Sequence, residues 1–196
     1  MAELSDNIID DKYEIIDCIG EGSYGYIYKA IDKKNKKLVA VKIENDNNEI
    51  LKKEIKTTLY LNKNNIEGVL KIQDYGFHDF NRYVVFNLLS DCFHKLMKIN
   101  KQFSKEKIFQ FAIASLNILK DIHSKNIVHR DIKPGNFMMG NDNNLYLIDF
   151  GLAEYTTYLL DEKRGPYTIG TEQFCSINIQ KGYEYSKRDD LISLGY

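Results

Sequence analysis

The chain has 196 residues, of which 43% are hydrophobic and 28% charged, as is ordinary for a globular protein with room for a sizeable core. Its net charge of −1 excludes a general attraction to nucleic acid or to an anionic membrane, so we expect neither as a partner. Three widely spaced cysteines predict no zinc site and no disulfide framework, which favours an intracellular compartment, the cytoplasm or the nucleus.

The first half of the chain predicts a small antiparallel sheet with one helix. Apolar runs indicate five strands, at residues 13–19, 26–31, 38–44, 70–77 and 82–89. The first two strands flank a glycine cluster at residues 20–25, so we expect a hairpin there. Leu51, Glu54 and Thr58 recur at intervals of three and four, which predicts a helix over residues 48–61.

The second half predicts longer helices and short strands. Residues 105–122 have helical spacing, and Ser104 is a candidate N-cap. Short strands then alternate with turns, at residues 127–129, 137–140 and 145–149. Residues 151–185 are predicted to be mostly loop, and another helix begins at Ser186. We place a boundary between two lobes near residues 89–90.

The stretch VHRDIKPGNF, residues 128–137, concentrates reactive groups in a loop punctuated by Pro and Gly. Asp131, Lys133 and Asn136 supply a carboxylate, an ammonium and a carboxamide within six positions. Phosphoryl transfer needs such a set: an acid that accepts a hydroxyl proton, a cation near the migrating group and an amide oxygen on Mg²⁺. Asp149, in an Asp-Phe-Gly triplet after the next predicted strand, offers a second metal ligand.

A bound nucleotide would explain two features of the predicted sheet. Glycines at residues 20–25 let backbone N–H groups approach a phosphate, although a dinucleotide-binding turn or a flexible hairpin are alternatives. A dinucleotide turn opens a helix, whereas a strand follows here. Lys42 interrupts an apolar strand, so it either reaches water from an edge strand or pairs with phosphates and a helix glutamate. We favour Glu54 over Glu49 as that glutamate.

From Gly20 to its last residue the chain resembles the eukaryotic protein kinases. The segments HRDIKPGNFMMG, IDFGLA, GTEQFCSIN and SKRDDLISLGY resemble the casein kinase 1 group, which includes the vaccinia-related kinases. The resemblance implies an α+β, two-lobed, protein-kinase-like fold with a five-stranded antiparallel N-terminal lobe. It implies a flexible N-terminus over residues 1–10, an N-terminal lobe over 11–89, and a truncated, mainly helical C-terminal lobe over 90–196 that ends in the helix begun at Ser186.

The resemblance also implies roles for individual residues. The implied catalytic set is Lys42, Glu54, Asp131, Lys133, Asn136 and Thr171. The implied magnesium ligands are Asn136 and Asp149. Residues of the glycine loop, the adenine pocket and the hinge would bind ATP: Ile19, Gly20, Glu21, Gly22, Ser23, Tyr24, Gly25, Ile27, Ala40, Lys42, Phe86, Asn87, Leu89, Ile148 and Asp149. Asp190 would anchor the backbone of the catalytic loop, and His129 and Phe150 would be structural.

The implied activity is ATP-dependent phosphorylation of protein serine or threonine. Lys133, two positions after Asp131, is typical of serine/threonine kinases. The resemblance implies protein substrates that are acidic or already phosphorylated. Lys187 and Arg188 could bind such groups, and a solvated helix start is an equally good explanation of these two residues. A catalytically silent, kinase-like scaffold is one alternative, supported by the truncation. An ATP-dependent enzyme acting on small molecules is another, and the segment GTEQFCSIN argues against it.

Overall fold

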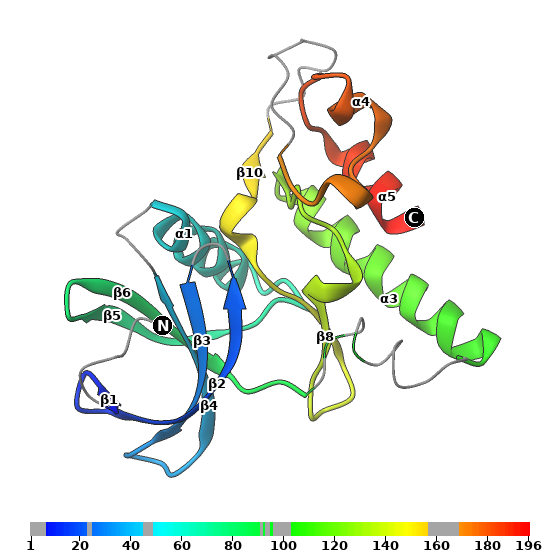
Figure 1. Ribbon diagram of the computed structural model, residues 1–196. Helices are drawn as coiled ribbons and strands as arrows, with labels where there is room; N and C mark the ends of the chain where they lie inside the picture. The colour runs from blue at the N-terminus through cyan, green and yellow to red at the C-terminus, as the bar shows by residue number, and fades with distance from the viewer. Residues whose placement is uncertain are drawn as a thin grey trace.

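The computed structural model describes residues 7–22, 25–44, 49–90, 92, 95, 103–156 and 169–196, which form two lobes. One lobe is a twisted sheet with a single helix, and the other is built from helices and short strands (Figure 1). The α+β class and the two lobes predicted from the sequence are therefore confirmed. Ser23 and Tyr24, which were predicted to contact ATP, lie outside the described residues.

The sheet of the first lobe has six antiparallel strands in the order β1-β2-β3-β4-β6-β5. Their bounds are β1 Ile8–Ile9, β2 Tyr13–Gly22, β3 Gly25–Asp32, β4 Leu38–Glu44, β5 Ile72–His78 and β6 Asn81–Asn87. All five predicted strands are present. Apolar side chains from β1, β2, β3, β4 and β6 form a core of their own, which includes Val39, Val41 and Val85.

The strand β1 corrects the prediction of a flexible N-terminus through residue 10. Ile9 is fully buried, and the N–H of Ile15 donates to the carbonyl oxygen of Asn7 at 2.8 Å. The Tyr83 hydroxyl donates to Asp10 at 2.7 Å, which fixes the chain just after the strand. A strand of two residues is too short to reveal a period, so the sequence pattern did not indicate it.

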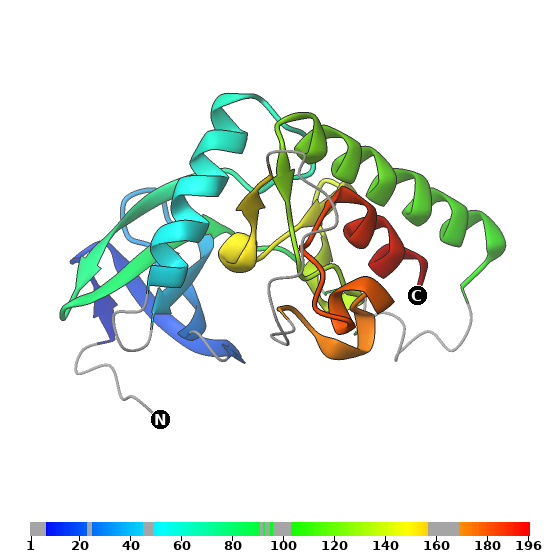
Figure 2. The same cartoon turned by 90° about the horizontal axis from the view of Figure 1, so that it is seen from above.

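The helix α1, Glu49–Lys63, begins and ends within two residues of the prediction. Its buried face includes Leu51, Glu54 and Thr58, so the predicted helical register is correct. Leu51 packs with Val84 of β6, whereas Leu61, near the end of the helix, belongs to the core of the second lobe. Figure 2 shows α1 between the sheet and the second lobe, so its placement affects both.

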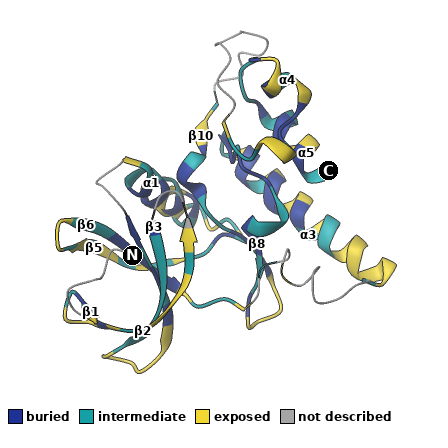
Figure 3. Cartoon of the chain, in the orientation of Figure 1, coloured by how far each residue is buried: buried dark blue, intermediate teal, exposed yellow. Residues whose placement is uncertain are grey.

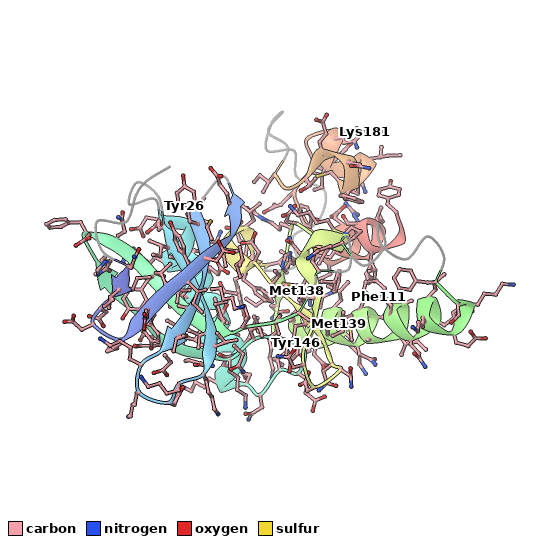
Figure 4. All side chains as sticks on the ribbon, turned by 60° about the horizontal axis from the view of Figure 1, so that its bottom comes forward. Tyr26, Phe111, Met138, Met139, Tyr146 and Lys181 are labelled. Atoms are coloured by element: carbon pink, nitrogen blue, oxygen red, sulfur yellow. The ribbon has the colours of Figure 1, made fainter. Side chains whose placement is uncertain are left out.

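Within residues 103–156 and 169–196, the second lobe contains three α-helices. They are α3 Lys105–Ser124, α4 Ile177–Gln180 and α5 Lys187–Gly195. Its short strands are β7 Ile127–Val128, β8 Phe137–Met139, β9 Leu145–Leu147 and β10 Glu154–Tyr155. The strands β8 and β9 form a hairpin that carries Met138, Met139 and Tyr146, labelled in Figure 4. Phe111 of α3 packs edge-on against Phe137 with 5.3 Å between ring centroids.

Side-chain caps fix the starts of α3 and α5 as the sequence predicts, and a third cap, at the start of α4, was not predicted. The Ser104 hydroxyl accepts from the N–H of Lys107 at the start of α3. Ser186 and Asp189 form a capping box at the start of α5. The Ser176 hydroxyl, at the start of α4, donates to Asp189 at 2.5 Å, so one buried carboxylate joins both helices.

Part of the surface of α3 is apolar. Phe109, Ile113 and Leu116 recur at helical spacing and are exposed, as the yellow segments of α3 in Figure 3 illustrate. On α5, Leu191 is exposed, while Leu194 packs against the core. None of the described helices combines the length and the apolar composition that a membrane crossing requires.

Candidate active site

Lys42 lies in the middle of the first lobe's sheet and reaches two carboxylates. Its strand β4 is flanked by β3 and β6, so Lys42 is not on an edge strand and does not reach water from one. Its Nζ is 2.6 Å from Glu54 Oε2 and 3.0 Å from Asp149 Oδ1. Burial lowers the pKa of Lys42, but the two carboxylates outweigh burial and raise this pKa above its usual value. The ammonium is therefore charged and fixed in place.

Glu54, the predicted partner from the helix, contacts Lys42, whereas the alternative, Glu49, pairs elsewhere. Glu54 is almost fully buried, on the face of α1 that looks toward β4. Glu49 is exposed and pairs with Lys52 at 2.5 Å. Thr58, one turn after Glu54, is also buried.

Asp131 is held from both sides of its carboxylate. Its Oδ1 accepts from the N–H of Thr171 at 2.9 Å and from the Thr171 hydroxyl at 2.7 Å. Its Oδ2 lies 2.7 Å from Lys133 Nζ and accepts from Asn136 Nδ2 at 3.0 Å. Burial raises the pKa of this carboxyl, but the contacts with Lys133 and Thr171 outweigh it and lower the pKa below its ordinary value. Asp131 is thus ionised and oriented.

Lys133 and Asn136 complete the arrangement predicted for the loop. Lys133 Nζ donates to the Thr171 hydroxyl at 2.9 Å, so Thr171 contacts both Asp131 and Lys133. The hydrogen bonds that the structure gives the Asn136 side chain come from Nδ2, to the carbonyl and the carboxylate of Asp131. Its amide oxygen is therefore available as an acceptor.

Asp190 of α5 is a buried hydrogen-bond acceptor for the backbone of the catalytic loop. Its carboxylate is fully buried and accepts from the N–H of His129 at 2.8 Å and from the N–H of Arg130 at 3.0 Å. His123 Nε2 contacts the same carboxylate at 2.8 Å. Arg130 has a φ of 69°, which costs about 1–3 kcal/mol for a residue with a side chain. The bond to Asp190 helps to hold this strained conformation.

His129 uses both ring nitrogens within the protein. Nε2 lies 3.0 Å from the carbonyl oxygen of Ile148, which can only accept, and Nδ1 accepts from the N–H of Asp131 at 3.3 Å. The ring packs edge-on against Phe150, with 5.0 Å between centroids. These contacts assign His129 to support of the loop, as the sequence analysis preferred, because neither nitrogen is left for a substrate.

A cavity of about 630 Å³ opens beside these groups. It is lined by many of the residues predicted to contact ATP: Ile19, Ile27, Ala40, Lys42, Phe86, Asn87, Leu89, Ile148 and Asp149. Glu54 and Asn136 also reach it. The volume suits a small-molecule ligand, and apolar walls with a few converging polar groups are typical of such sites. Gly20, Glu21, Gly22 and Gly25 pair at the end of the β2–β3 hairpin and do not line this cavity.

Sequence reasoning missed several residues that line this cavity, among them Leu70, Met138 and Leu147. Met138 and Leu147 come from the β8–β9 hairpin. The sequence analysis predicted its two strands but assigned no role to these two residues. A larger cavity of about 1060 Å³ contains Asn117 and Asp142 and none of the predicted catalytic side chains. The smaller cavity is therefore the candidate active site.

Gly170 allows the segment before Thr171 to approach the catalytic loop. Its φ is +95°, and a Cβ there would lie 2.3 Å from the carbonyl oxygen of Arg130. We expect Gly170→Ala to displace Thr171 from Asp131 and to destabilise the fold by about 1–3 kcal/mol because of the strained φ. Urea unfolding and phosphotransfer assays would measure both effects. Gly195→Ala is the control, since no atom beyond its chain neighbours and its own helix backbone lies within 4 Å of a Cβ at that position. Equal behaviour of the two variants would contradict the expectation.

Comparisons with known proteins bear on the family of the chain. The model of the protein kinase domain matches residues 13–196. A curated relative, casein kinase I homolog 2 of Schizosaccharomyces pombe, is 33% identical over 203 aligned residues, which cover 97% of this chain. The chain spans 46% of that relative, less than half of its length.

Proposed function

Because the chain belongs to the protein kinase family, we propose that it transfers the γ-phosphoryl group of ATP to serine or threonine residues of proteins, as a casein kinase 1-like enzyme. One observation carries the proposal. A single ionised carboxylate, Asp131, is fixed by Thr171, Lys133 and Asn136 next to a cavity that Lys42 and Asp149 also reach.

ATP would bind in the 630 Å³ cavity with its adenine between apolar walls. Ile27 and Ala40 on one side and Ile148 on the other line the cavity. Backbone groups at residues 87–89, which also line it, would recognise the edge of the base. The charged Lys42, held by Glu54, would bind the α- and β-phosphates.

The donor set fits Mg²⁺, which prefers oxygen ligands. The amide oxygen of Asn136 is given no hydrogen bond among the described residues, and Asp149 contributes a carboxylate whose pKa burial raises but Lys42 lowers further. Asp149 stands at a left-handed φ of 65°, which is uncommon for a residue with a side chain and occurs where the surroundings impose it. Bound magnesium would supply positive charge to the phosphates.

Transfer itself would depend on positioning and electrostatics. Asp131 would orient the substrate hydroxyl and accept its proton. Lys133 would stabilise negative charge on the transferred group. Thr171, which contacts both side chains, would fix their positions relative to each other. This division of roles matches the chemistry that phosphoryl transfer requires.

Protein substrates that are acidic or already phosphorylated remain part of the proposal through the resemblance to casein kinase 1. The geometry gives less support to Lys187 and Arg188 as the residues that bind them. Lys187 Nζ donates to Asn126 at 3.0 Å, and Arg188 Nε lies 3.9 Å from Asp189. Both cations therefore have partners within the chain.

A kinase-like scaffold without transferase activity is the second candidate. The apolar stripe of Phe109, Ile113 and Leu116 on α3 favours it, because exposed patches of this kind mark surfaces that bind a partner. The intact set of catalytic side chains favours the enzyme instead.

The deciding experiment is a phosphotransfer assay on this chain with Mg-ATP and casein. We expect labelled phosphate on serine and threonine and none on tyrosine. Lys42→Met is the matched negative variant, because it removes the ammonium that would bind the phosphates. ATP binding without transfer in the unmodified chain would support the scaffold and contradict the enzyme.

A further inference from the structure

Strand β4 contacts the helix α1 through two side chains rather than one. Lys42 and Glu44 are two residues apart on this strand, so their side chains point to the same face. Lys42 reaches Glu54 in the second turn of α1. Glu44 lies next to the first turn, where the backbone N–H of Leu51 lowers the pKa of its carboxyl. The sequence analysis assigned no role to Glu44.

Glu44 is an unusual residue for a protein interior. It is 1% exposed, yet neither carboxylate oxygen makes a hydrogen bond of normal geometry to a described residue. Burial raises the pKa of this carboxyl, and the N–H of Leu51 and the charge of Arg82 oppose that rise. A buried carboxylate with incomplete partners lowers stability, so packing alone does not explain its presence.

Arg82 of β6 is the cation that faces Glu44. Its Nε is 3.4 Å from Glu44 Oε2, and its Nη2 is 3.6 Å from Glu49 Oε1 at the start of α1. Its guanidinium lies over the Phe77 ring, 4.8 Å from the centroid, which fixes the side chain against β5. The contact with Glu49 is exposed and contributes little, so Arg82 acts on α1 mainly through the buried carboxylate of Glu44.

These contacts place negative charge at the positive end of a helix. Glu44 is near the first turn of α1, whose unpaired N–H groups favour an anion. A two-point attachment, at the first turn and at Glu54, restricts both the position and the tilt of α1. Without the polar attachment at the first turn, the apolar contacts of α1 would restrict its tilt less tightly.

We propose that Glu44, with Arg82, is a positioning residue that holds α1 where Glu54 meets Lys42. The inference rests on the proposed kinase function, in which the Lys42–Glu54 pair must be formed for transfer. Glu44 touches no reacting group and acts only through the placement of Glu54.

The test compares Glu44→Gln with Glu49→Gln. Both substitutions remove one negative charge that faces Arg82, but Glu49 is exposed and is not attached to β4. We expect Glu44→Gln to lower kcat about three- to thirty-fold with a smaller change in KM for ATP, and Glu49→Gln to leave both nearly unchanged. Arg82→Met should act in the same direction as Glu44→Gln.

A double variant separates positioning from a general loss of stability. On a Glu54→Gln background, adding Glu44→Gln should lower the residual rate no further, because the pair that Glu44 supports is already broken. An equal loss on both backgrounds would overturn the proposal.

Hydrogen exchange decides the inference even if the chain transfers no phosphate. Amides of α1 should exchange about three- to thirty-fold faster in Glu44→Gln than in the unmodified chain, while those of α3 stay unchanged. Absence of transfer together with this result would contradict the proposed function and retain the positioning role. Unchanged exchange in α1 would contradict the positioning role itself.

Discussion

Replacing Asp131 with Asn is expected to lower the rate of phosphoryl transfer by about 10²- to 10⁴-fold, the usual contribution of a general base. The amide keeps the size of the side chain and can still contact Thr171, but it cannot accept a proton from the substrate hydroxyl. ATP affinity should change little, because Asp131 is not among the residues that line the nucleotide cavity. Single-turnover transfer and titration with a fluorescent ATP analogue would measure the two quantities separately.

Asp121→Asn is the matched control for this variant. Asp121 lies on α3 and lines the cavity of about 1060 Å³. Its substitution therefore makes the same chemical change away from the proposed site. Its transfer rate should equal that of the unmodified chain. If Asp131→Asn transferred phosphate at that rate too, Asp131 would not be the base.

Removing the Asp190 carboxylate should produce the largest loss of stability. We expect Asp190→Ala to lower the free energy of unfolding by about 3–5 kcal/mol, since it leaves buried partners without their acceptor. The partners are the N–H groups of His129 and Arg130 and the ring of His123. Urea unfolding monitored by circular dichroism would measure the change, with a lower midpoint at a constant slope.

Asp121→Ala is the control for the loss of a carboxylate, because the hydrogen bond that the described structure gives Asp121 is accepted by its backbone carbonyl oxygen, from the Ser124 hydroxyl. Its midpoint should stay close to that of the unmodified chain. Asp190→Asn should be less destabilising than Asp190→Ala, because its amide oxygen still accepts one hydrogen bond. A midpoint for Asp190→Ala equal to the control would show that the catalytic loop does not depend on α5.

Periodic patterns in the sequence were sufficient for most of the fold. Leu51, Glu54 and Thr58 predicted the buried face of α1, and Ser104 and Ser186 predicted two helix starts. Each of these signals is local, since it depends on residues within one or two turns. The short strand at Ile8–Ile9 was missed because its stability comes from Tyr83 and β2, which are distant in sequence.

The candidate site was predictable where a residue type is chemically unusual for its surroundings. Lys42 in an apolar strand required a partner, and Asp131, Lys133 and Asn136 stand too close together for chance. Lining residues such as Met138 carry no such signal, because an apolar residue in a strand is ordinary. Glu44 was missed although it ends the same strand as Lys42, since a carboxylate at a strand end usually faces solvent.

The attachment of the catalytic loop to Asp190 has a consequence for synthesis on the ribosome. The backbone N–H groups of His129 and Arg130 donate to Asp190, which lies 61 and 60 residues further along the chain. While the ribosome is still adding those residues, the N–H groups of His129 and Arg130 lack the Asp190 acceptor that helps to hold the strained turn. The sheet of the first lobe, with β1–β6 all before residue 88, has no such dependence. The nascent chain can therefore complete the sheet of its first lobe well before its catalytic loop, and the loop acquires its geometry only when α5 has formed.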